Sequence, residues 1–103
     1  MPYSLALSAL SHPARRSLYD RLRGGEKAVG ELARSVRRSQ PLVSQHLRVL
    51  ERARLVTARR EGTRHLYRVR PEGLAELRAW VESLWDDVLA AYAGAPRENE
   101  EER

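Results

Sequence analysis

The chain has 103 residues, no cysteine and a formal net charge of +5. Without cysteine it has no disulfides, no thiolate metal ligands and no cysteine nucleophile. No stretch approaches the about 20 apolar residues that span a bilayer, so we expect a cytoplasmic protein without a membrane partner. The length predicts one small domain with a modest core, which dimerisation would help to stabilise.

The positive charge is concentrated in the middle of the chain. Residues 1–33, 34–70 and 71–103 carry net charges of +2, +9 and −6, and all eleven basic residues of the middle segment are arginines. A strong local positive field beside an acidic end favours a polyanion bound by one face. Both tryptophans lie in the acidic third, so the basic region lacks the apolar face of an interfacial membrane helix. We therefore expect nucleic acid as the partner.

Three short helices are expected in the first third of the chain. Residues 4–10 form an apolar helix, which ends at Ser11-His12-Pro13, where a second helix begins. That helix covers residues 13–23 and ends at Gly24-Gly25, because glycine permits the left-handed conformation that closes a helix. Residues 28–36 form the third helix, with apolar residues on one side.

A fourth helix, about residues 40–53, carries the most informative pattern in the chain. Ser39 or Gln40 suits the N-cap region, and Pro41 suits the first turn. Apolar residues at three- and four-residue spacing leave a polar face free. Gln and Ser side chains both donate and accept hydrogen bonds, so they can read base edges in a major groove. The side chains expected at base edges are Ser39, Gln40, Pro41, Ser44, Gln45 and His46.

The third and fourth helices, joined by a short turn, form a candidate helix-turn-helix. Residues 55–70 follow, in which Glu61-Gly62-Thr63 separates two strand-like runs, a pattern typical of a hairpin. Its basic tip suits a wing that lies on a phosphate backbone or enters a minor groove. The arginines and the histidine assigned to the tip or to phosphates are Arg37, Arg38, Arg48, Arg59, Arg60, Arg64 and His65.

Pro71 begins a last helix, expected to run to about Tyr92 and to stop at Gly94-Ala95-Pro96. Its apolar stripe is broad enough to pack on its own domain and on a partner subunit. The expected dimer interface consists of Leu5, Leu74, Leu77, Val81, Leu84, Trp85 and Val88. Residues 1–94 are thus expected to form one DNA-binding and dimerisation domain, and residues 95–103 a disordered charged tail.

This order of elements resembles the winged helix-turn-helix regulators of the bacterial ArsR/SmtB family. The stretch from Ala9 to Arg16 (ALSHPARR) is similar to that family's opening AL-x-(D/H)-P-x-R signature, and the stretch from Ser39 to Leu50 is similar to its recognition helix. The resemblance covers about residues 5–92. It implies a mainly helical winged fold with a small β-hairpin, dimeric through its first and last helices, that binds an operator and represses transcription until an effector releases it.

Two departures from the family pattern concern the turn after the recognition helix and metal sensing. The family often has glycine after the recognition helix, where this chain has Arg54. Metal-sensing members commonly use a cysteine pair, or histidine with carboxylates on the terminal helix; this chain has no cysteine and no histidine after His65. The resemblance therefore does not identify an effector.

Two alternatives to an operator-binding repressor without a cofactor remain open. A nickel- or zinc-responsive sensor would need two or more of His12, His46 and His65 brought together, or carboxylates with another group. The candidate carboxylates are Glu72, Glu76, Asp86 and Asp87. A protein-interaction module would instead use the helix that carries Trp80 and Trp85 to bind a different protein. We do not expect an enzyme. The sequence shows no serine-histidine-aspartate spacing, no phosphate loop and no paired-carboxylate cleft.

Overall fold

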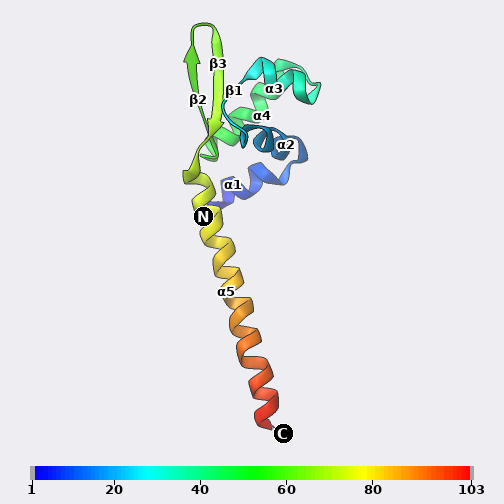
Figure 1. Cartoon of the computed structure of the whole chain (residues 1–103), viewed down its shortest axis with the longest axis vertical. Coiled ribbons are helices and arrows are strands. Elements are labelled where there is room, and N and C mark those ends of the chain that lie inside the picture. The colour runs from blue at the N-terminus through cyan, green and yellow to red at the C-terminus, as the bar shows by residue number, and fades with distance from the viewer. Residues whose placement is uncertain (1, 103) are drawn as a thin grey trace.

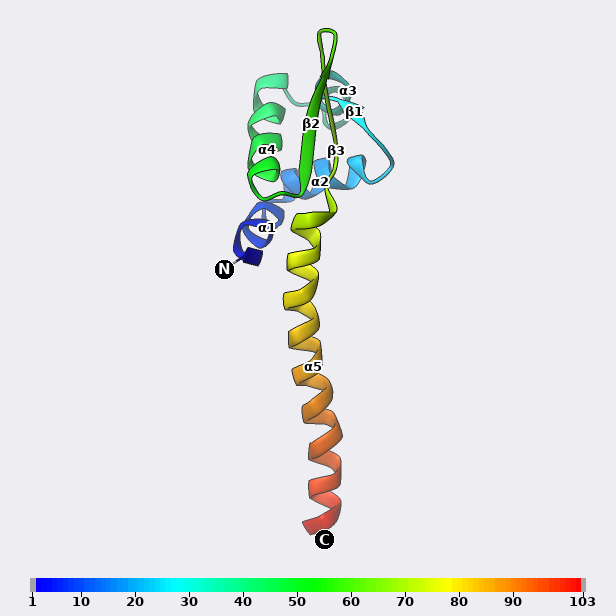
Figure 2. The same ribbon diagram turned by 90° about the vertical axis from the view of Figure 1, so that its left-hand side faces the viewer.

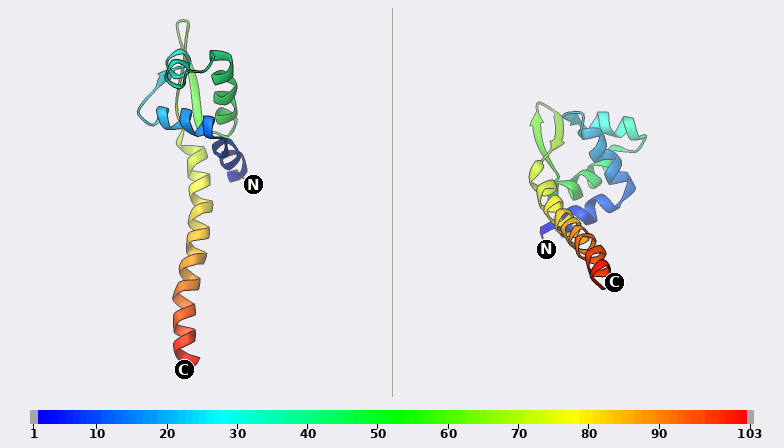
Figure 3. Two further views of the ribbon diagram at one scale, coloured as in Figure 1. Left: turned by 90° about the vertical axis from the view of Figure 1, so that its right-hand side faces the viewer. Right: turned by 60° about the horizontal axis from the view of Figure 1, so that its bottom comes forward.

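The computed structural model describes the backbone of residues 2–102 and the side chains of residues 3–93. A body of helices and a small sheet stands on one long helix, which leaves the body as a single rod in every view (Figures 1 and 3). The elements are α1 (Pro2–Ser11), α2 (Pro13–Leu22), β1 (Lys27–Ala28), α3 (Val29–Val36), α4 (Gln40–Arg52), β2 (Val56–Glu61), β3 (Arg64–Val69) and α5 (Pro71–Glu102).

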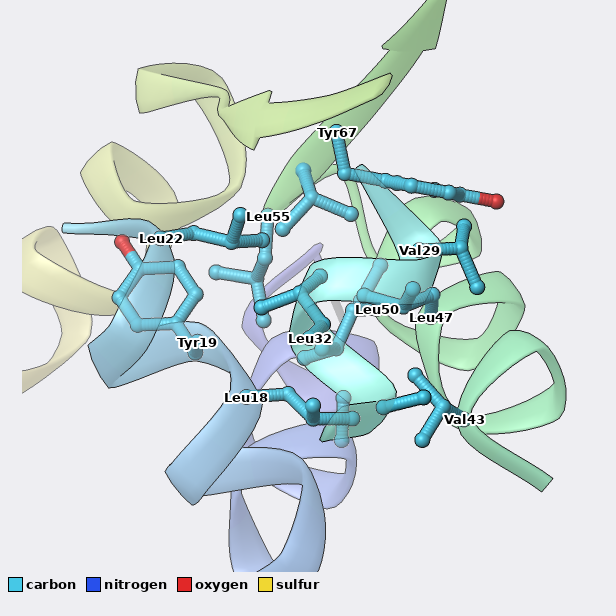
Figure 4. Packing of buried hydrophobic residues seen from close by; sticks show 14 of the residues in the cluster. Leu18, Tyr19, Leu22, Val29, Leu32, Val43, Leu47, Leu50, Leu55 and Tyr67 are labelled. Atoms are coloured by element: carbon cyan, nitrogen blue, oxygen red, sulfur yellow. The ribbon is translucent and has the colours of Figure 1, made fainter. Parts of the chain in front are cut away.

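The core lies where α1 to α4 meet the base of the sheet. Leu32 of α3 and Leu47 and Leu50 of α4 are fully buried, and Figure 4 shows the side chains of all three helices α2, α3 and α4 converging there. Leu18 and Leu22 of α2 are also buried. Burying a leucine side chain stabilises a fold by about 1.5–3 kcal/mol, so this cluster fixes how α4 sits on the body.

The sheet has three antiparallel strands in the order β1-β3-β2. The hairpin of β2 and β3 was expected, and it pairs Arg60 with His65 and Glu61 with Arg64 next to the turn. The strand β1 was not expected, and α3 begins at Val29 rather than at residue 28. In β1, Lys27 pairs with Tyr67 and Ala28 pairs with Leu66. A strand of two residues is too short to show the alternation by which a strand is recognised in a sequence.

The ALSHPARR stretch forms the junction of α1 and α2, and several of its side chains hydrogen-bond to the backbone there. Nδ1 of His12 accepts a hydrogen bond from the backbone N–H of Ala14 at 3.1 Å, which caps α2. Arg15 donates through Nε to the carbonyl of Ala9 at 2.8 Å, and Arg16 donates to the carbonyl of Leu10 at 2.9 Å. These arginines satisfy carbonyl groups at the end of α1 that have no partner within the helix.

The end of α4 rests on the first turn of α5. Arg54 has a φ of 62° in the turn after α4, the left-handed conformation that glycine adopts at least cost. Its carbonyl accepts the N–H of Gly73 at 2.9 Å, and its guanidinium lies 3.1 Å from the carboxylate of Glu76. A Cβ on residue 73 would come within 2.5 Å of the carbonyl oxygen of Ala53. Glycine at position 73 is therefore required for this close approach.

Helix α5 differs from its prediction at its far end. Its backbone bounds extend to Glu102, so the expected stop near Tyr92 was wrong. A glycine inside a helix costs only about 1 kcal/mol relative to alanine, which is too little to end a helix by itself. Side chains 94–103 lie outside the described residues, and the charged tail at 95–103 stays a prediction. None of the helices in the described part of the chain combines the length and the apolar character of a bilayer-spanning segment.

Candidate nucleic-acid interface

The polar face of α4 points away from the core, as the sequence predicted. Val43, Leu47 and Leu50 are buried, whereas Gln45 and Arg48 are exposed and Ser44 is half-buried. Ser39 is the N-cap, and its Oγ accepts the N–H of Leu42 at 3.4 Å. The hydroxyl of Ser39 therefore has its hydrogen left to offer as a donor to another group. Gln45 and Arg48 are therefore accessible to a ligand on this outward face.

Gln40 is turned toward α3 and the wing. A Cβ on Gly30 would lie 3.3 Å from Nε2 of Gln40. Gln40 also lines a cleft of about 310 Å³ together with Thr63, Arg64 and His65 at the hairpin turn. The start of α4 and the wing tip, separated by many residues in the sequence, thus belong to one surface. Figure 2 shows α4 beside the hairpin that carries this tip.

Two of the wing arginines assigned to DNA form ion pairs with carboxylates of their own chain. Arg59 donates to both carboxylate oxygens of Glu26, at 2.8 Å and 2.7 Å, and also lies 3.4 Å from Glu61. The hydrogen bond from Arg59 lowers the pKa of Glu26, and the hydrogen bond to Glu26 raises the pKa of Arg59. Because Glu26 and Glu61 oppose its charge, Arg59 offers less attraction to a phosphate than its sequence position suggested.

Arg64 is also paired. Its guanidinium lies 3.3 Å from Oε1 of Glu31, and the same oxygen accepts the N–H of Ala28 at 2.9 Å. That backbone hydrogen bond is the main reason why the pKa of Glu31 is lowered. Glu31 therefore ties the wing to the start of α3 and orients the tip relative to the helix-turn-helix.

Four other predicted phosphate ligands, Arg37, Arg38, Arg48 and Arg60, are exposed. None of them forms an ion pair with another described residue. Arg37 ends α3 with a φ of 58°, so the turn between α3 and α4 holds two arginines at the surface. Arg34 and Arg68 are exposed as well. Both belong to the basic middle segment of the sequence, and neither was expected at the interface.

Two of the three histidines lie close together, and the third lies on the wing. The rings of His12 and His46 lie 4.9 Å apart, and His65 lies 5.0 Å from the ring of Tyr67 on the wing. Burial, followed by the charges of His12 and Arg15, lowers the pKa of His46. Within the described part of the chain, no three histidine, aspartate or glutamate side chains gather closely enough to hold a metal ion. His46 thus lies between the outward face of α4 and α2.

An apolar stripe on α5 is left uncovered by the residues that the structure describes. Val81, Leu84, Trp85 and Val88 are exposed by 41% or more, and α5 stands clear of the body along this length (Figure 1). Leu5 of α1 and Leu74 are also exposed, whereas Leu77 packs against the core. Tyr3 of α1 stacks on Trp80, with ring centroids 4.6 Å apart. Trp80 therefore faces its own chain, and Trp85 lies on the uncovered side.

Comparisons with known proteins agree with this geometry. Residues 10–59 match a family described as a helix-turn-helix domain. The chain is 49% identical over 88 residues to the HTH-type transcriptional regulator Rv2034 of Mycobacterium tuberculosis, covering 85% of this chain and 82% of the relative. It is 38% identical to the biofilm growth-associated repressor of Agrobacterium fabrum, over 93% of this chain and 75% of the repressor.

A solved structure is similar in both fold and sequence. It is the homodimeric winged helix-turn-helix DNA-binding domain of a possible ArsR-family transcriptional regulator from Mycobacterium bovis. The TM-score is 0.68 at 35% identity, over 85% of this chain and 82% of that one. With the helix-turn-helix, the basic wing and these relatives together, the chain belongs to the ArsR/SmtB family of winged helix-turn-helix transcriptional regulators.

Proposed function

We propose that this protein is a bacterial repressor that binds an operator in double-stranded DNA as a homodimer and acts in the cytoplasm. The carrying observation is the outward face of α4, where Gln45 and Arg48 are exposed while buried Leu47 anchors the helix. A glutamine reads adenine through paired hydrogen bonds, and an arginine reads guanine or neutralises a phosphate. In this proposal α4 lies in the major groove.

The wing, residues 55–70, contacts the backbone or the minor groove beside α4. The cleft that Gln40 shares with Arg64 and His65 supports one continuous surface. Because Arg60 has no acidic partner among the described residues, we assign it the main phosphate contact of the wing. Gln45 and Ser44 are the main base readers, and Ser39, Gln40, Pro41 and His46 line the edge of that contact.

The homodimer forms through α1 and α5. The exposed apolar stripe of α5 includes Trp85, which is 60% exposed, and Leu5 of α1 is 61% exposed. Monomers rarely leave so many large apolar side chains in one line uncovered. The M. bovis relative is described as a homodimer, which supports a second copy of this chain as the cover. A two-fold dimer would then meet two half-sites about 34–36 Å apart.

A titration of labelled duplex from the protein's own upstream region, followed by fluorescence anisotropy, tests the proposal. A shuffled duplex of the same composition is the control. We expect a tight curve on the upstream duplex, two protomers per duplex at saturation, and much weaker binding to the shuffled one. Superimposable curves would contradict operator recognition. Repeating the titration with a chelator, and then with nickel or zinc, tests the metal-responsive alternative.

A further inference from the structure

A cavity lies between the start of α2 and the recognition helix α4. Its volume is about 450 Å³, within the range of about 300–1,000 Å³ that small-molecule sites occupy. Its apolar lining includes Leu18 and Val43, which are buried, and Leu42, which is exposed. Its polar lining includes His12, Arg38 and His46. An apolar wall with a few polar groups is the composition of a ligand site.

The hydrogen bonding of His12 decides what kind of ligand fits. Nδ1 of His12 accepts the N–H of Ala14 and caps α2. A neutral imidazole has one acceptor nitrogen and one donor nitrogen, so Nε2 of the capping His12 carries a hydrogen. A metal ion needs a nitrogen lone pair, which this ring cannot offer at Nε2 while it caps the helix. His12 therefore suits a ligand that accepts a hydrogen bond.

The charge around the cavity has one sign. Among the described residues, no aspartate or glutamate lines it, and Arg38 brings a permanent positive charge. Burial lowers the pKa of His46 most, and the electrostatic influence of His12 and Arg15 lowers it further. An anion in the cavity would be attracted by the guanidinium of Arg38. It would also raise the pKa of His46.

We propose that this cavity binds a small organic anion, a carboxylate on a compact apolar body, and that the bound anion weakens the binding of α4 to DNA. Arg38 lines the cavity and is one of the expected phosphate ligands, so an anion that pairs with Arg38 competes with DNA for it. Only the regulatory half of this proposal rests on the proposed function, because the binding of the anion does not require DNA.

Benzoate serves as the probe, and uncharged benzamide, of similar size and shape, serves as its control. In the full-length protein labelled with ¹⁵N-histidine, NMR follows the three imidazoles separately. Benzoate is expected to shift the signals of His12 and His46 saturably, with a dissociation constant in the millimolar range, and to raise the pKa of His46. His65 lies on the wing and is expected not to respond. A response that is absent, or equal with benzamide, overturns the anion site.

Two neighbouring arginines provide a matched pair of variants. Arg38 lines the cavity and Arg37 does not, and both are exposed. Arg38→Gln is expected to weaken benzoate binding about tenfold, whereas Arg37→Gln leaves it unchanged. Circular dichroism confirms that both variants are folded. Equal benzoate affinities for the two variants overturn the role of Arg38 and with it the proposed site.

Anisotropy titrations on the upstream and shuffled duplexes, with and without saturating benzoate, separate the two halves of the proposal. Benzoate is expected to weaken binding to the upstream duplex about fivefold or more. If the cavity saturates and DNA affinity stays the same, the regulatory half is overturned and the site stands. If duplex shifts His46 and benzoate does not, the cavity is a phosphate contact and the proposal is wrong. If no duplex binds while benzoate does, the proposed function fails and the anion site stands.

Discussion

The backbone N–H of Gly73 donates to the carbonyl oxygen of Arg54 at 2.9 Å, which joins the first turn of α5 to the end of the recognition helix. Next to it, the N–H of Arg70 donates to the carbonyl of Leu55 at 2.8 Å. The helix with the uncovered apolar stripe is therefore in direct backbone contact with the turn that follows the helix proposed to read DNA. A shift of α5 in a dimer would move the end of α4.

Gly73→Ala is expected to destabilise the protein. The added Cβ would lie 2.5 Å from the carbonyl oxygen of Ala53 and 2.6 Å from that of Arg54, so backbone has to move. Overpacking of this kind costs about 1–3 kcal/mol, measured as a lower free energy of unfolding in urea. Gly24→Ala is the control, because its Cβ would meet only the carbonyl oxygen of Arg21 at 3.8 Å. Equal stability of the two variants would contradict the close approach.

Arg60→Ala is expected to reduce the salt dependence of DNA binding more than Arg59→Ala. Each neutralised phosphate contributes about 0.9 to the slope of log K against log salt concentration. Arg60 has no acidic partner among the described residues, whereas Arg59 is held by Glu26 and Glu61. Anisotropy on shuffled duplex at several salt concentrations gives both slopes. A larger loss of slope for Arg59→Ala would show that DNA displaces Glu26 from Arg59.

His46 is expected to make stability depend on pH. Its pKa in the folded protein lies below the ordinary value of 6.5, because of burial first and then of the electrostatic influence of His12 and Arg15. The unfolded chain takes up this proton at higher pH than the folded one. The free energy of unfolding therefore falls as pH decreases below about 6.5, until the folded protein also protonates His46.

Urea unfolding of the wild type and of His46→Gln across this range isolates the contribution of His46. The variant is expected to lose less stability between pH 7 and about 5 than the wild type. Parallel curves for the two proteins would show that the folded environment leaves the protonation of His46 unchanged.

Val81→Glu is expected to dissociate the proposed homodimer. Val81 is 49% exposed in the single chain, and a carboxylate in a buried interface lacks the hydration that it has in the monomer. Sedimentation equilibrium is expected to show a dissociation constant raised about tenfold or more, which corresponds to about 1.4 kcal/mol. Glu82→Gln, at the next position on α5 and paired with Arg78, is the control. An unchanged dimer in Val81→Glu would place the interface elsewhere and favour a different protein as the cover of α5.

The sequence predicted the features that depend on residues close together in the chain. It missed the features that depend on contacts between residues far apart in the chain. The cap at Ser39, the buried face of α4 and the hairpin follow from residues close together in the chain. The ion pair of Arg59 with Glu26 joins residues far apart in the sequence, and β1 exists only because β3 lies beside it. The approach of His12 to His46 likewise depends on how α2 packs against α4. Only the structure therefore shows which arginines are paired with a carboxylate and which are not paired with another described residue.

The central claim is that α4 reads bases through Gln45. It is tested most directly by comparing how much Gln45→Ala weakens binding to the upstream duplex and to a shuffled duplex. The dissociation constants of wild type and Gln45→Ala are measured on the upstream duplex and on a shuffled duplex at the same salt concentration. Gln45 is exposed on α4, and a base contact of this kind contributes about 1–3 kcal/mol of discrimination. We expect Gln45→Ala to bind the upstream duplex about tenfold more weakly and the shuffled duplex unchanged. An equal loss on both duplexes, or no loss on either, would contradict base reading by Gln45.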